Sequence, residues 1–190
     1  MKEIPITIID KDITYTIERR KVKYIRYELK SNRLKLIIPN NFKGDIETYI
    51  HKKDKWIYKK ITEYEKLNEK LQKQTFGKKL INRNLNQLKI LSQEYIEKYQ
   101  KILNVKVNRV QYRDMTKKWG SCSSLKNITL SKNLKYLPDE LVAYIIYHEL
   151  AHILVLAHND EFFNIIKKEF PDYKKYDEYL TQYWYLIRNI

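Results

Sequence analysis

Residues 137–152 read LPDELVAYIIYHELAH, and this stretch predicts a buried helix that carries polar side chains. The proline and two acids at its start are typical of a helix N-terminus. The apolar residues that follow cover most faces of a helix, which indicates burial. His148 and His152 are four residues apart, so both imidazoles project from one face. Because unpaired polar groups are costly to bury, these histidines and Glu149 require a partner, and a metal ion supplies one.

The spacing His148-Glu149-Leu150-Ala151-His152 is typical of a catalytic zinc site. Two histidines at this spacing reach one ion, and Glu149 can take a proton from water bound to it. His158 follows after five intervening residues and would complete the ligand set. Three protein ligands leave one position for water, which marks a catalytic rather than a structural Zn2+. The chain has only four histidines, and three of them fall within eleven residues, which argues against coincidence.

The length and the cysteine content restrict the class of protein. A chain of 190 residues suits one core with an appended subdomain. Cys122 is the only cysteine, so an intrachain disulfide is excluded and a reducing, cytoplasmic compartment is expected. We interpret Cys122 as an apolar filler rather than as a fourth ligand or a switch. No apolar run is long enough to span a membrane, and charges near the N-terminus interrupt any signal peptide.

The formal net charge of +15 suggests a polyanionic partner. Residues 1–80 carry 21 Lys and Arg against 11 Asp and Glu, so most of the excess lies away from the metal motif. Nucleic acid is one partner that such a charge would attract. A general enrichment in Lys, Ile, Asn and Tyr explains the same composition without any partner, and both interpretations stay open.

Hydrophobic periodicity predicts an α+β fold. Alternating residues over 4–39 predict strands with turns near 10–12 and 30–32, and helical spacing over 45–74 predicts one long basic helix. Further segments are expected in the following order: a helix over 85–103, a strand near 105–112, short strands at 119–124 and 127–131, the metal helix, a helix capped by Asn159 or Asp160 and stopped by Pro171, and a terminal helix over 176–190. We expect two parts: a β-rich subdomain with the long helix over 1–80, and a catalytic core over 81–190.

The block Trp119-Gly120-Ser121-Cys122-Ser123, followed by a strand, the metal helix and His158, resembles the YgjP-like metallopeptidases, a zincin family related to the SprT-like proteases. The resemblance covers most of the chain and includes Arg113-Asp114-Met115. It implies a zincin-like core, an active-site helix against a small sheet, and a zinc-dependent peptidase. It also implies zinc held by the three histidines with Glu149 as general base. SprT-like relatives digest proteins bound to DNA, which agrees with a basic chain.

The sequence departs from the family pattern at three positions, and none of them is a proposed ligand. Lys118 stands where arginine often precedes the tryptophan, Ala157 replaces a common asparagine, and Phe163 replaces a tryptophan. These differences concern the substrate surface rather than the metal.

Several residues are expected to contact the substrate. The strand at 127–131 would pair with an extended substrate backbone. Trp119 would help to form a wall or, in the interpretation that we prefer, pack in the core, and Gly120 and Ser121 would permit close approach of the backbone. The tetrahedral oxyanion of peptide hydrolysis needs a donor, and the candidates by position in the sequence are Arg113, Tyr112, Lys117, Lys118 and Tyr147.

Two other functions remain compatible with these residues. The same zinc chemistry would hydrolyse a non-peptide substrate such as a nucleic acid or another amide. Alternatively, zinc would be structural in a module whose basic N-terminal part binds a polyanion. The open coordination position and Glu149 favour the enzyme, and we expect a polypeptide substrate.

Overall fold

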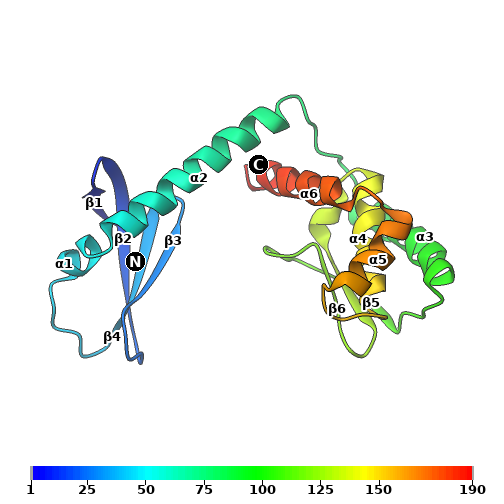
Figure 1. The fold of residues 1–190 in the computed structure, drawn as a ribbon, viewed down its shortest axis with the longest axis horizontal. Coiled ribbons are helices and arrows are strands. Elements are labelled where there is room, and N and C mark those ends of the chain that lie inside the picture. The colour runs from blue at the N-terminus through cyan, green and yellow to red at the C-terminus, as the bar shows by residue number, and fades with distance from the viewer. Residues whose placement is uncertain (1, 190) are drawn as a thin grey trace. The chain divides into compact units, whose positions relative to one another are not determined.

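A computed structural model describes residues 2–189, which form two small sheets and six α-helices (Figure 1). The fold is of the α+β class, as the sequence predicts. The chain divides into two compact units, Met1–Lys73 and Gln74–Ile190, and each is described by itself. No helix among residues 2–189 combines the length and the apolar character needed to cross a membrane.

The first unit is a four-stranded sheet packed against two helices. Its strands are β1 (Ile4–Ile8), β2 (Lys11–Arg20), β3 (Arg26–Lys30) and β4 (Arg33–Pro39). The order across the sheet is β1-β2-β4-β3, with β2 and β4 parallel and the other pairs antiparallel. Inward-facing residues of the strands share a core with Ile50 of α1 (Ile46–His51) and with Ile57 and Ile61 of α2 (Asp54–Thr75). The helices therefore cover one face of the sheet.

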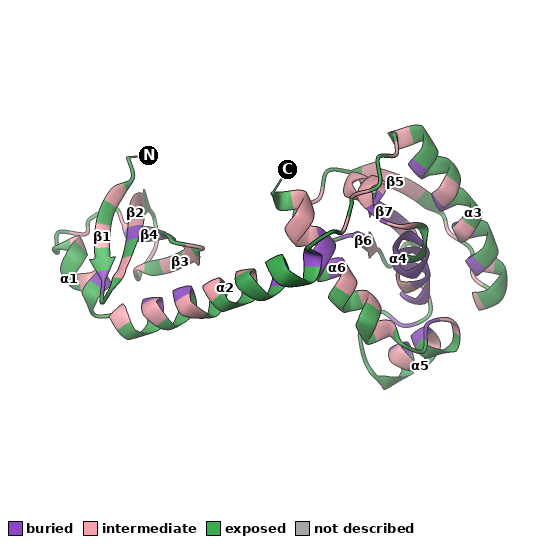
Figure 2. Cartoon of the chain, turned by 90° about the horizontal axis from the view of Figure 1, so that it is seen from above, coloured by how far each residue is buried: buried purple, intermediate pink, exposed green. Residues whose placement is uncertain are grey.

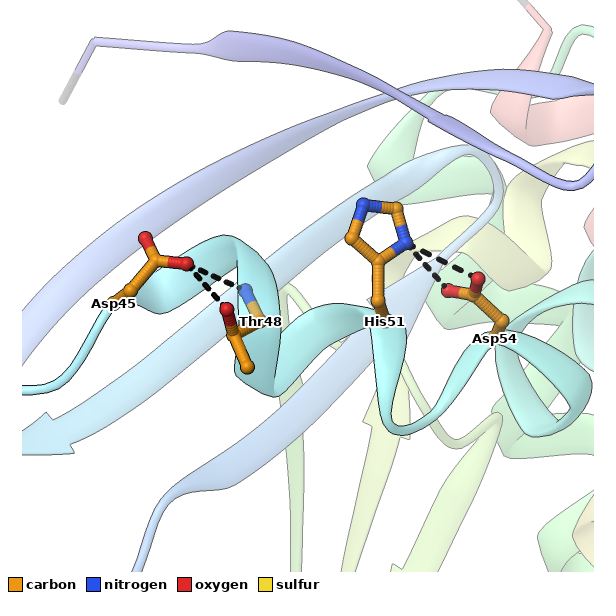
Figure 3. A network of polar contacts seen from close by, with 4 residues as sticks. All are labelled: Asp45, Thr48, His51 and Asp54. Carbon is orange, nitrogen blue, oxygen red and sulfur yellow. Dashed lines mark hydrogen bonds and ion pairs between the residues drawn. The ribbon is translucent and has the colours of Figure 1, made fainter.

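Helices α1 and α2 are separated at residues 52–53, instead of forming the single long helix expected from the sequence. Oδ2 of Asp45 accepts hydrogen bonds from the backbone nitrogen of Thr48 at 3.0 Å and from its hydroxyl at 2.5 Å, which caps α1 (Figure 3). Across the break, Nδ1 of His51 lies 3.1 Å from both carboxylate oxygens of Asp54 (Figure 3). The first contact marks the start of α1, and the second joins its last residue to the first residue of α2.

The second unit combines a three-stranded sheet with four α-helices. Its elements in chain order are α3 (Leu85–Leu103), β5 (Arg109–Arg113), β6 (Gly120–Cys122), β7 (Asn127–Ser131), the 3-10 helix η1 (Lys132–Tyr136), α4 (Asp139–Ala151), α5 (Asp160–Glu169) and α6 (Tyr173–Arg188). The strand order is β5-β7-β6, with β5 parallel and β6 antiparallel to β7. The residue range of α3 matches the predicted one, because Asn84 and Gln87 form a capping box at its start.

Helix α4 lies at the centre of the second core (Figure 2). Ten of its thirteen residues are buried, as expected for a helix that is apolar on most faces. It contacts α3, β6, α5 and α6. Arg83 holds its start by donating hydrogen bonds to the Leu137 carbonyl and the Asp139 carboxylate. The metal motif is therefore carried by the most enclosed helix of the unit.

Some local features differ from the sequence-based expectation. The 3-10 helix η1 was not predicted, and it forms because the Ser131 hydroxyl caps it through the backbone nitrogen of Asn133 while Leu134 enters the core. Helix α6 begins at Tyr173, before the expected start at residue 176. These differences concern element boundaries, which periodicity defines poorly.

Replacement of Leu130 by alanine should destabilise the second unit strongly. Leu130 is fully buried in the central strand β7, so its loss leaves a cavity and should lower the free energy of unfolding by about 2–5 kcal/mol. The matched control is Leu125→Ala in the exposed β6–β7 turn. This substitution should change the free energy of unfolding by less than about 0.5 kcal/mol. Urea titrations in a Trp56→Phe background would follow the fluorescence of Trp119 and Trp184. Equal losses in both variants would contradict the placement of β7.

Candidate metal centre

Three histidine side chains converge at the C-terminal end of α4. His148 and His152 belong to the last turn and C-cap of α4, and His158 lies in the segment that leads to α5. One ring nitrogen of each lies within 4.8 Å of those of the other two, and Nε2 of His148 is 3.1 Å from Nε2 of His158. Two nitrogens bound tetrahedrally to one Zn2+ at about 2.0–2.1 Å are about 3.3 Å apart. The observed spacing therefore fits such an ion.

The protonation states of the imidazoles also suit a metal. Nδ1 of His152 lies 3.1 Å from the Val155 carbonyl oxygen, which can only accept, so Nδ1 carries the proton and Nε2 keeps a free lone pair. Burial, reinforced by the neighbouring histidines, lowers the pKa of His148 to about 3. Burial likewise lowers the pKa of His152. Neutral imidazole is the form that binds metal ions.

The side chain of Phe162 forms an apolar floor under the three imidazoles. Its ring centroid lies 4.9 Å from that of His148, 4.5 Å from that of His152 and 4.8 Å from that of His158. The Asn159 side chain positions this residue by accepting a hydrogen bond from the Phe162 backbone nitrogen at 3.0 Å. The sequence predicted the Asn159 cap, but it did not indicate that the first turn of α5 supports the histidines.

Glu149 is buried next to the histidines and lacks a partner of its own. Only 6% of its surface is exposed, and no hydrogen bond or ion pair joins its carboxylate to another side chain within residues 2–189. Burial raises the pKa of Glu149 to about 7, and the positive charge of Lys118 opposes this rise. A Cβ atom at Gly120 would lie 2.6 Å from Oε1 and 2.7 Å from Cγ of Glu149. Only glycine therefore permits β6 to approach this carboxylate.

The histidines and Glu149 open into a pocket of about 470 Å³ within the second unit. Residues 118–122 form one wall, and Tyr144 and Ile145 of α4 form another. Asp177 and Leu180 of α6 complete the lining. The contributions of Tyr144 and α6 were not predicted, because nothing in the local pattern of the sequence indicates that they face the metal helix.

The expectation that residues 127–131 pair with a substrate backbone is wrong. This segment is β7, and both of its edges are occupied, by β5 on one side and β6 on the other. A hydrogen bond of 2.8 Å from the Ser131 nitrogen to the Trp119 carbonyl extends the pairing with β6. Strand β6 is one of the two edge strands of this sheet, and all three of its residues line the pocket. Its outer edge offers free backbone groups beside the metal centre.

The expected substrate-binding residues lie in two different places. Trp119, Gly120 and Ser121 all line the pocket. Trp119 is also a packing residue, with 9% of its surface exposed and its ring stacked on Trp184 at 4.1 Å. Arg113 ends β5, at the opposite edge of the sheet from β6, and donates a hydrogen bond to Gln111 at 2.9 Å. It does not contribute to the pocket lining.

The candidate oxyanion donors and Cys122 also differ in whether they line the pocket. Of the possible oxyanion donors, only Lys118 lines the pocket. Tyr147 is buried and donates its hydroxyl to the Ile165 carbonyl at 3.2 Å. Cys122 is half-buried in the pocket wall, and burial raises the pKa of its thiol.

The chain belongs to the YgjP-like metallopeptidase family, because residues 68–183 match its metallopeptidase domain. Members of such a family use a divalent metal, typically zinc, and the three-histidine cluster provides residues to hold one. No curated protein matches the chain.

Two solved structures are similar to part of the chain. The metallopeptidase zymogen abylysin of Pyrococcus abyssi is 25% identical, with a TM-score of 0.44, and the match covers 47% of this chain and 90% of that one. The metallopeptidase zymogen jannalysin of Methanocaldococcus jannaschii is 27% identical, with a TM-score of 0.42, and the match covers 54% of this chain and 94% of that one.

A Gly120→Ala variant should separate the position of Glu149 from metal binding. The added methyl would overlap the Glu149 side chain and displace its carboxylate, whereas the histidines would remain in place. We expect a fall in hydrolytic kcat of about 100-fold, as for a misplacement of about 1 Å. Elemental analysis of the Gly120→Ala variant should show the same metal content as in the wild type. Full activity in this variant would contradict the close approach of β6.

Proposed function

We propose that the chain is a zinc-dependent peptidase in which His148, His152 and His158 hold the ion and Glu149 is the general base. The observation that carries this proposal is an unpartnered, buried carboxylate in the same pocket as three converging imidazoles. When bound there, Zn2+ would supply a Lewis acid that polarises the scissile carbonyl and makes water more acidic.

Glu149 takes the proton from the attacking water and delivers it to the leaving amine. Its burial suits this task, because desolvation raises the affinity of the carboxylate for a proton. Of the candidate oxyanion donors, Lys118 is the one that lines the pocket. We therefore propose that its ammonium group stabilises the developing oxyanion. The free edge of β6 binds the substrate as an added strand, which holds the scissile bond against the metal centre.

A polypeptide is the preferred substrate because an edge strand recognises extended backbone and the family is one of metallopeptidases. In this proposal residues 81–190 form the catalytic core, and the basic part over 1–80 contacts nucleic acid or another polyanion. The protein would act in the cytoplasm, where its single cysteine stays reduced.

Metal analysis tests the ligand set directly. Purified protein supplied with zinc and then dialysed should retain about one zinc per chain, and His152→Ala should lose it. His51→Ala is the matched control, because His51 is the one histidine outside the cluster and should leave the zinc content unchanged. Equal zinc contents in the two variants, or none in the wild type, would refute the site.

Hydrolysis assays test the assignment of Glu149. Glu149→Gln preserves the shape of the side chain but removes the base, so casein cleavage should fall by about 100- to 10,000-fold while zinc is retained. Glu140→Gln, an exposed position on the same helix, should keep wild-type activity. The assays should be run with and without DNA. Cleavage of an oligonucleotide instead of casein, lost in Glu149→Gln, would favour the non-peptide hydrolase.

A further inference from the structure

The α6 wall of the pocket carries a carboxylate that the proposed mechanism does not use. Oδ1 of Asp177 accepts a hydrogen bond from the Tyr144 hydroxyl at 2.8 Å. No ion pair joins Asp177 to any Lys or Arg among residues 2–189, although Lys174 and Lys175 precede it on the same helix. In a chain with 38 Lys and Arg, this carboxylate lines the pocket without a cation of its own.

Tyr144 holds the Asp177 carboxylate in a fixed orientation. Its side chain is only 2% exposed, and its ring stacks on Tyr176 at 5.1 Å and meets the edge of Phe170 at 5.3 Å. The hydroxyl therefore has little freedom, and the carboxylate that it contacts is pre-organised. Burial raises the pKa of Asp177, whereas the hydrogen bond from Tyr144 and the nearby His158 lower it. Asp177 as a residue remains exposed, so its carboxylate is accessible to a ligand in the pocket.

The pocket surface beside this carboxylate is apolar. Ile145, Leu156 and Leu180 belong to the same lining. Lysine and arginine bury their methylene stems along apolar surface and keep the charged end in polar surroundings. A cationic end would also form a charge-assisted hydrogen bond with Asp177, and these are among the stronger ones. A neutral aliphatic side chain would form no such charge-assisted contact, and an acidic side chain would be repelled.

We propose that Asp177 forms a subsite that binds a cationic group of the substrate, so that the enzyme prefers peptides with lysine or arginine beside the cleaved bond. This inference rests on the proposed peptidase function and specifies its substrate class. A free N-terminal ammonium has the same chemistry as a lysine side chain, so the two sources must be distinguished by experiment.

The test uses the full-length, zinc-loaded protein and quenched fluorogenic peptides with acetylated N-termini. The peptides differ only in carrying Lys or norleucine next to the cleaved bond, and one further norleucine peptide has a free N-terminus. The cationic peptide should have a kcat/KM about tenfold higher, as expected for one charge-assisted contact. Asp177→Asn should reduce this ratio to about one, and Asp177→Lys should shift the preference to a glutamate peptide.

Glu178→Gln is the matched control, because it removes the same charge from the next position of α6 outside the pocket lining and should keep the wild-type ratio. A preference for the free N-terminus that Asp177→Asn abolishes would support the subsite and identify the terminal ammonium as its ligand. Equal ratios in wild type and Asp177→Asn would overturn the proposal. Loss of zinc in Asp177→Asn would overturn it too, since Asp177 would then serve the metal.

A binding measurement tests the subsite independently of catalysis. Calorimetry with zinc-loaded Glu149→Gln should show tighter binding of the lysine peptide than of the norleucine peptide, and the difference should vanish when Asp177→Asn is added. Absence of cleavage by the wild type would refute the peptidase function alone. Equal binding of both peptides would refute the subsite alone.

Discussion

The enclosure of His148, His152 and Glu149 on α4 is the constraint around which the second unit is organised, since His152 and Glu149 are buried and His148 is half-buried. Such groups are costly in an apolar core unless they have partners. The neighbouring elements enclose these groups from three directions: His158 lies in the segment after α4, Phe162 of the first turn of α5 packs against the imidazoles, and β6 approaches Glu149 at Gly120. In the resulting cavity, burial lowers the pKa of His148 and raises the pKa of Glu149.

The order of the strands determines which backbone edge lies beside the histidine pocket. Because β7 is paired on both sides, its backbone groups are satisfied and it serves as structural support. The shorter β6 occupies the edge, and its residues line the pocket. The sequence distinguishes these strands poorly, since both are short and both precede the metal helix. Sheet order depends on hydrogen bonds between segments that local periodicity does not report.

Helix α6 contributes more to the pocket than its sequence suggests. Its spacing predicts a packing helix, and Trp184 does pack, against Trp119. The same helix also presents Asp177 and Leu180 to the metal pocket. A charged residue on an amphipathic helix is normally interpreted as solvent-exposed. Only the contact with Tyr144, far away in the sequence, shows that Asp177 has a defined orientation.

The sequence by itself determined the α+β class, the range of α3, the burial of α4 and the grouping of its histidines with Glu149. These features depend on residues a few positions apart, where helical spacing and capping act directly. Tertiary structure alone decided the strand order, the break between α1 and α2, the Phe162 floor and the position of Asp177, and it placed Arg113 away from the pocket. These features arise because packing joins segments distant in the chain; at the α1–α2 break, Ile50 of α1 and Ile57 of α2 both enter the core of the first unit.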